Sequence, residues 1–191
     1  MVEEARLEQL DSGLAPTSDG WFVVNVGDAA WITNEAFGAR CVFEAAGPVL
    51  RRRPDLPPQR FADIGFTLQV IRPGQASGMY HTETNQENFL VLAGECLLIV
   101  EGEERPLRAW DFVHCPPGTA HVFVGRGEGP CVIFMVGGRT REKGIVYPRS
   151  ELALGHGAGV EAETSSPKEA YAACPDWQPE RPADSSGTPW A

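Results

Sequence analysis

The segment MYHTETNQENFLVLAGE, residues 79–95, contains three side chains that could do chemistry together. His81, Glu83 and Glu87 occupy odd positions directly before an apolar run that begins at Phe89. Side chains alternate along a strand, so these three can face the same interior as Phe89. Two carboxylates in a low-dielectric interior repel each other, and a proton, an arginine or a metal ion relieves that cost.

A second segment, DFVHCPPGTAHVFVG over residues 111–125, offers a partner for them. Its Pro-Pro-Gly turn leads into a new strand at His121. Two imidazoles and two carboxylates form a ligand set suited to a divalent ion such as iron, manganese or zinc, with nickel as a further option. The ligands of this metal site would be His81, Glu83, Glu87 and His121. The alternative is a structural histidine at position 81 beside a solvated acidic loop.

Short β-rich runs separated by Gly and Pro extend from Trp21 to Val136 and predict an antiparallel sandwich or barrel. VEGEER predicts a hairpin turn through Gly102, and GRGEGP a turn through Gly127 and Gly129. The predicted strands cover residues 21–26, 39–45, 66–71, 88–94, 95–101, 111–116, 121–125 and 131–137.

Three segments are predicted from the change in composition along the chain. Residues 1–20 form an N-terminal arm, in which Glu3 to Leu10 could form a short helix. Residues 21–140 form the β-barrel domain. Residues 141–191 form a C-terminal strap or tail whose last part is loose, because Gly, Ala, Ser, Pro and Glu dominate it.

Composition and charge exclude several classes of partner. The chain has 191 residues, 42% of them apolar, and a net charge of −10, so it repels nucleic acid and anionic lipid surfaces. No apolar segment reaches the roughly 20 residues of a membrane span, which predicts a cytoplasmic protein. The five cysteines include no C-x-x-C pair, and three of them, Cys96, Cys115 and Cys131, are interpreted as small buried hydrophobic residues.

The two segments resemble the two motifs of the cupin superfamily. The first motif, H-x-H followed by Glu and Gly, matches His81 to Gly94, although Glu83 occupies the position of its second histidine. The second motif, P-x-G-x-x-H, matches Pro116 to His121. Fifteen residues separate Gly94 from Trp110, which is the short spacer typical of bacterial cupins.

The resemblance implies a fold, a metal and an oligomer. The fold is an all-β jelly-roll barrel, a double-stranded β-helix of two antiparallel sheets. The implied ligands are His81, Glu83, Glu87 and His121, and the implied assembly is a homodimer. The apolar side chains of even parity are expected to need cover, from a partner or from the strap, on the outer face of the barrel: Leu90, Leu92, Leu98 and Val100. The sequence departs from the motifs at three turn or strand-end positions, namely Gln75, Trp110 and Gly125.

Two classes of function are consistent with such a site. The first, which the sequence favours, is a metal-dependent enzyme that acts on a small polar substrate by isomerase-, decarboxylase- or dioxygenase-type chemistry, with Glu83 and Glu87 as candidate catalytic residues. The second is a sensor or accessory protein that binds a small molecule without turning it over. A third option is a site without metal, in which His81 and Glu87 form an acid and base pair.

Overall fold

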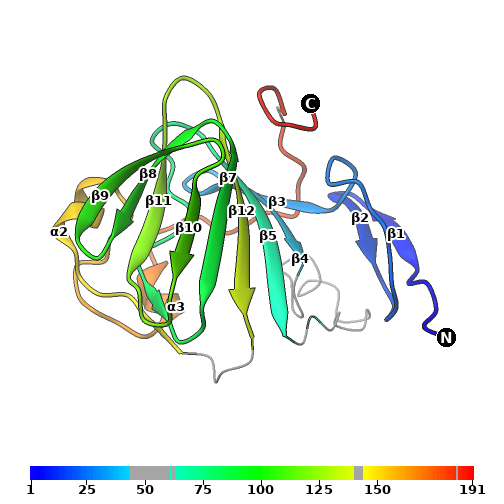
Figure 1. Cartoon of the computed structure of the whole chain (residues 1–191), viewed down its shortest axis with the longest axis horizontal. Coiled ribbons are helices and arrows are strands. Elements are labelled where there is room, and N and C mark those ends of the chain that lie inside the picture. Colours follow the sequence, from blue (N-terminus) through cyan, green and yellow to red (C-terminus); the bar gives the residue numbers. More distant parts are fainter. Residues whose placement is uncertain (44–60, 62, 140–143, 184) are drawn as a thin grey trace.

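The computed structural model describes residues 1–43, 61, 63–139, 144–183 and 185–191. Two antiparallel sheets face each other and enclose the main core, while a small hairpin near the N-terminus extends from one end (Figure 1). The prediction of an all-β fold of jelly-roll type is confirmed. The strand predicted over residues 39–45 is described only as far as Phe43.

The strands form two main sheets and two small pairs. The six-stranded sheet contains β3 (Trp31–Asn34), β4 (Gly38–Phe43), β5 (Ile64–Ile71), β7 (Glu87–Ala93), β10 (Phe112–Cys115) and β12 (Cys131–Gly138), in the order β10-β7-β12-β5-β4-β3. The three-stranded sheet contains β8 (Glu95–Val100), β9 (Glu103–Arg108) and β11 (His121–Arg126), in the order β11-β8-β9. The small pairs join β1 (Leu7–Leu10) to β2 (Gly13–Pro16) and β6 (Thr82–Glu83) to β13 (Ile145–Val146).

Two short helices lie in the C-terminal segment, α2 (Glu151–Gly155) and α3 (Pro167–Ala170). Ser150 and Ser166 cap them, each accepting a hydrogen bond from a backbone N–H in the first turn. In the part of the chain that the structure describes, no helix is long and apolar enough to cross a membrane.

The space between the two sheets is filled by one apolar cluster. Phe89 and Val91 from β7 meet Phe123 from β11 there, which confirms that the odd positions of β7 face the interior. The three central cysteines are buried in this cluster, as predicted. Its full membership is Ile71, Phe89, Val91, Cys96, Leu98, Cys115, Phe123, Cys131 and Ile133.

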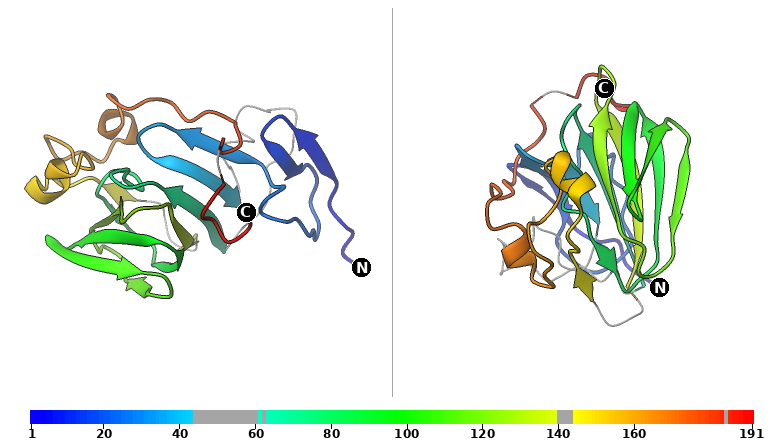
Figure 2. Two further views of the ribbon diagram at one scale, coloured as in Figure 1. Left: turned by 90° about the horizontal axis from the view of Figure 1, so that it is seen from above. Right: turned by 90° about the vertical axis from the view of Figure 1, so that its left-hand side faces the viewer.

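The opposite face of the three-stranded sheet is covered by the C-terminal segment, which lies along the outside of the sheets (Figure 2). Leu97 and Ile99 from β8 pack there with Tyr147, Ala153 and Ala158. The strap therefore buries apolar surface of its own barrel. Such burial is the main favourable contribution to folding.

The prediction that Leu98 and Val100 lie on the outer face of the barrel is wrong. Leu98 lies in the cluster between the sheets and Val100 packs against it, so the even positions of β8 face inward. The chain passes from one sheet to the other at Gly94, and the parity of the inward face changes there from odd in β7 to even in β8. Leu92 packs on the outer side of the six-stranded sheet, as expected.

Two predictions for the N-terminal region are wrong. The segment expected to be helical forms the β1–β2 hairpin, because the sequence Asp-Ser-Gly turns the chain back at Gly13, with φ of 126°. The segment 21–26 forms no strand. Asn25 instead starts a turn in which its side chain accepts a hydrogen bond from the Gly27 N–H. The strand follows this turn, as β3.

The predicted hairpin at Gly102 is confirmed. Glu101 and Gly102 join β8 to β9 with φ values of 49° and 79°, the signature of a two-residue type I′ turn. The Glu101 carboxylate accepts a hydrogen bond of 2.6 Å from the Ala120 N–H, so this turn also anchors the residue before His121.

Trp110 adopts a backbone conformation that favours glycine, with φ of 76°, and its side chain is 74% exposed. A side chain at such a φ costs roughly 1–2 kcal/mol, part of which glycine returns through its greater freedom in the unfolded chain. We expect Trp110→Gly to raise the free energy of unfolding by about 1 kcal/mol in a denaturant titration. Trp110→Ala, which keeps the Cβ atom, should gain much less; an equal gain would show that backbone strain is not the cause.

Candidate metal centre

The two histidines are backbone neighbours although forty residues separate them in the sequence. The N–H of His81 donates to the carbonyl of His121 at 3.2 Å, and the N–H of His121 donates to that of His81 at 3.0 Å. Residues paired in this way project their side chains to the same side. Their imidazole centroids consequently lie 5.1 Å apart.

Both imidazoles are held in the same orientation by backbone carbonyls. His81 Nδ1 lies 2.7 Å from the Met79 carbonyl oxygen, and His121 Nδ1 lies 3.0 Å from that of Thr119. A carbonyl oxygen only accepts, so each Nδ1 carries the proton and each Nε2 presents a lone pair. Metal-binding histidines are commonly fixed by such a bond from the other ring nitrogen.

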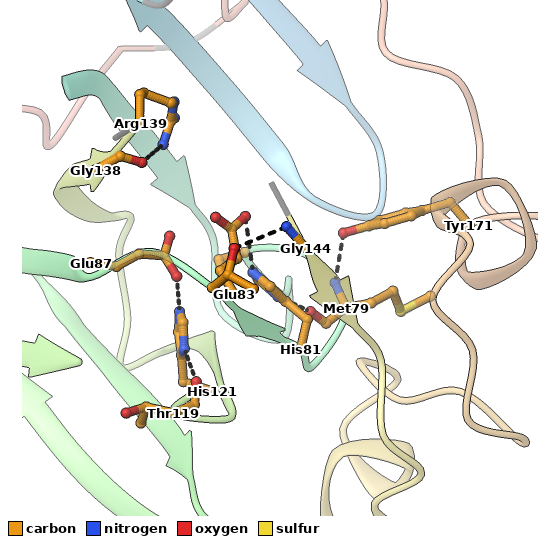
Figure 3. Close-up of polar contacts among 12 residues, drawn as sticks. Met79, His81, Glu83, Glu87, Thr119, His121, Gly138, Arg139, Gly144 and Tyr171 are labelled. Atoms are coloured by element: carbon orange, nitrogen blue, oxygen red, sulfur yellow. Dashed lines mark hydrogen bonds and ion pairs between the residues drawn. The ribbon is translucent and has the colours of Figure 1, made fainter. Parts of the chain in front are cut away.

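Glu87 completes a group of three convergent ligands. It begins β7 and pairs with Gly137 of β12, and its Oε2 lies 3.5 Å from His121 Nε2. The ligand atoms of His81, Glu87 and His121 all lie within 4.8 Å of one another. Figure 3 shows these three side chains pointing toward a common centre from separate parts of the chain.

Glu83 lies at the edge of this group. Its Oε1 is 3.9 Å from His81 Nε2. Glu83 also lines the same cavity as His81, Glu87 and His121. Glu83 belongs to β6, which the strap extends through β13, and its carbonyl accepts a hydrogen bond from the Gly118 N–H. The turn that delivers His121 is thus tied to the first motif. Whether Glu83 is a fourth ligand stays a prediction.

The donor set fits a divalent ion. Two ligand atoms bound at about 2.1 Å to one ion lie roughly 3.0–3.4 Å apart at tetrahedral or right angles. The 3.5 Å between Glu87 and His121 is close to that separation. Neutral imidazoles with a carboxylate suit zinc, iron, manganese and nickel, and the donors do not select among these metals.

The comparison with protein families identifies this part of the chain. Residues 67–137 match the model of the cupin domain. The matched range includes the four predicted ligands, His81, Glu83, Glu87 and His121. This part of the chain is therefore a cupin domain, which confirms the resemblance found in the two motifs. A search among curated proteins finds no match.

Three solved structures resemble this cupin. A proposed sugar phosphate isomerase from Acidithiobacillus ferrooxidans is 31% identical over 45% of this chain and 56% of its own, with a TM-score of 0.43. A Cupin 2 conserved barrel domain protein from Salinispora arenicola is 29% identical over 40% and 63%, with a TM-score of 0.37. A sugar phosphate isomerase of the cupin superfamily from Silicibacter pomeroyi is 19% identical over 64% and 79%, with a TM-score of 0.48. This cupin therefore matches less than two thirds of the length of the first two.

The structure explains one departure of this cupin from the family motifs. A Cβ atom at Gly125 would lie 2.1 Å from the carbonyl oxygen of Arg72, so only glycine fits where the motif has Asn. The Gly125 N–H donates to the Gln75 carbonyl, and the Gly74 N–H donates to the Gly125 carbonyl. These bonds hold the end of β11 against the segment that precedes the first motif.

Burial determines the protonation of the candidate ligands in this cupin when no metal is bound. Desolvation, followed by repulsion from Glu83, raises the pKa of Glu87 to about 8, although Arg139 opposes the shift. Desolvation, followed by the neighbouring His121, lowers the pKa of His81 to about 4. The pKa of His121 is also lowered, mainly by burial. The imidazoles are therefore neutral at pH 7, as metal binding requires.

These shifts give the metal-free cupin a distinctive pH dependence. Between pH 4.5 and 8 folded Glu87 keeps a proton that the unfolded chain releases, so Glu87 makes stability fall as pH rises. His81 acts oppositely, but only between about pH 4 and 6.5. We therefore expect the free energy of unfolding, measured in chelator, to fall by about 1–2 kcal/mol from pH 6.5 to 8. Glu87→Gln should remove this slope. A slope that persists in the variant would assign it to other groups.

The cavity also contains residues that the sequence analysis missed. It has a volume of about 210 Å³, and Arg40, Arg139 and Tyr171 line it together with the candidate ligands. Arg40 is a charged residue in the middle of an apolar strand, which is the sequence signal that could have found it. Tyr171 comes from the C-terminal segment, and nothing in its local sequence indicates a role at this site.

The other two histidines lie away from the candidate ligands. His114 is exposed on β10, and its Nδ1 lies 2.8 Å from Asn88 Oδ1. His156, at the C-cap of α2, lies 2.8 Å from Glu104 Oε1. Neither lines the cavity, so both have a structural role in this protein.

Proposed function

We propose that this cupin binds one divalent metal ion through His81, Glu87 and His121 and is a metal-dependent enzyme acting on a small polar substrate. The observation that supports this most is the convergence of two Nε2 lone pairs and a carboxylate at the wall of one cavity. The ion, when bound, would supply a Lewis acid that polarises an oxygen of the substrate.

The protein's own groups would bind the substrate, exclude water and move a proton. Phe89, Phe123 and Met135 form an apolar part of the cavity wall, which lowers the local dielectric constant. Glu83 lies beside the three convergent ligands, within reach of a small molecule in the cavity. We assign to its carboxylate the role of general base, with Glu87 chiefly a ligand. A homodimeric, cytoplasmic enzyme and the division into arm, barrel and tail stay predictions.

The test combines metal analysis with turnover. Protein purified without a chelating tag should contain about one divalent metal ion per chain, and a panel of small polar substrates should include one that it converts. Glu83→Gln should keep the metal but lower kcat at least a hundredfold, since it removes only a proton acceptor. Glu87→Gln should lose both metal and turnover.

The opposing results are equally specific. Metal-loaded protein that is stabilised by small molecules but converts none of them would favour the binding-module alternative. Protein that turns over without metal and in the presence of chelator would favour an acid and base pair formed by His81 and Glu87.

A further inference from the structure

Arg40 brings a guanidinium group to the wall of the metal cavity. It lies on β4, in the six-stranded sheet, and lines the same space as His81, Glu87 and His121. Placing an arginine toward a barrel interior costs free energy, because its charge loses contact with water there. A group in this position is therefore a candidate for contact with a ligand.

Contacts with Gln69, Ser77 and Trp177 hold Arg40 in place. Its Nε donates to Gln69 Oε1 at 3.1 Å, its Nη2 donates to the Ser77 carbonyl, and the ring of Trp177 lies 4.6 Å from its Cζ. Gln69 is itself completely buried, and its Nε2 donates to the carbonyls of Phe37 and Ser77 at 2.9 and 3.0 Å. The guanidinium is thus pre-organised, which reduces the entropy lost when a ligand binds it.

The charges around the cavity favour an anion once a metal is present. Among the described residues of the wall, Arg40 and Arg139 balance Glu83 and Glu87, and a histidine that binds a metal is neutral. A divalent ion would therefore leave an excess of two positive charges in a partly enclosed space. A negatively charged ligand would offset this excess.

We propose that the substrate is a small organic acid and that Arg40 binds its carboxylate while the rest of the molecule reaches the metal. The inference rests on the proposed metal-dependent function. A planar carboxylate matches the fork of a guanidinium. The cavity of about 210 Å³ is smaller than most ligand sites, which favours a compact acid over a larger phosphorylated molecule.

Calorimetry with a matched pair of probes tests the charge that the site recognises. Malonate and malonamide share one skeleton, but only malonate is an anion. We expect malonate to bind the metal-loaded protein and malonamide to bind at least tenfold more weakly. Equal binding of the two, no binding of malonate, or tighter binding of inorganic phosphate than of malonate would each overturn the proposal.

Variants test the residue. Arg40→Gln should weaken malonate binding at least tenfold, since a charge-assisted bidentate contact is lost. Arg126→Gln, a matched change at an exposed arginine at the end of β11 away from His121, should leave it unchanged. Arg40→Lys keeps the charge but lacks the fork of the guanidinium, so it should bind malonate with intermediate affinity. If the melting curve shows that Arg40→Gln does not fold, Arg40→Lys takes its place in the test. Wild-type affinity in a folded Arg40 variant would overturn the proposal.

Metal analysis of the same samples separates this proposal from the proposed function. If the protein contains about one metal ion per chain and the Arg40 variants bind malonate with wild-type affinity, only the role of Arg40 is overturned. If wild-type protein takes up no metal, the proposed function fails. In that case the same titration of the metal-free protein tests the contact with Arg40 by itself: loss of malonate binding in the Arg40 variants supports that contact, and unchanged or absent binding overturns it.

Discussion

His121→Ala is expected to remove the bound metal. His121 is buried, its Nε2 faces Glu87, and its backbone is paired with that of His81, so it is the best-fixed of the convergent ligands. Loss of one imidazole should weaken metal affinity at least a hundredfold, beyond the roughly 10–100-fold typical of losing an outer partner of a ligand. Elemental analysis after dialysis, and competition with a coloured chelator, measure the change. Turnover should disappear with the metal.

The matched control is His114→Ala. His114 is exposed on β10 and contacts Asn88, so its removal changes the histidine count without touching the cavity. Metal content and affinity should equal those of the wild type. If the two variants lost metal to the same extent, or if His121→Ala kept it, the proposed ligand set would have to be abandoned.

Ala158→Glu is expected to destabilise the fold by about 4 kcal/mol or more. Ala158 belongs to the strap and is fully buried on the outer face of the three-stranded sheet, and its carbonyl accepts a hydrogen bond from the Tyr80 N–H. A carboxylate at this position would be buried without a compensating partner, or would force the strap away from Leu97 and Ile99. Denaturant titration measures the loss.

The matched control is Ala172→Glu, which introduces the same carboxylate at an exposed position of the same segment. It should change stability by less than about 0.5 kcal/mol. Equal effects of the two substitutions would mean that the strap does not pack on the sheet in solution. Light scattering of the wild type across a dilution series separates packing within one chain from exchange with a second copy, because only the latter depends on concentration.

The sequence by itself determined the class of the fold and indicated three of the candidate ligands. Short runs of β-branched and aromatic residues between Gly and Pro can form only short strands with tight turns, and Gly102 marks one such turn. The spacing of His81, Glu87 and His121 within the two motifs was sufficient to indicate them as candidate ligands, because Glu87 and His121 each begin a strand. The structure brings these three residues together.

Glu83 lines the cavity, as predicted, but for another reason than alternation along a single strand. Alternation would require one strand through residues 81–91, whereas β6 ends at Glu83 and β7 begins at Glu87. Both carboxylates nevertheless line the cavity, because β6 pairs with β13 and the Gly118 N–H bonds to the Glu83 carbonyl. Contacts distant in sequence fixed the orientation of Glu83.

Only the tertiary structure decided which residues surround the candidate ligands. Arg40 and Tyr171 lie 131 residues apart in the chain, yet they line one cavity. The change of inward face at Gly94 likewise depends on the path between two sheets. Alternation along a strand states which residues share a face, but which face is buried depends on what packs against it. In this protein the strap packs on Leu97 and Ile99, so the odd positions of β8 are buried under the strap and the even positions face the other sheet.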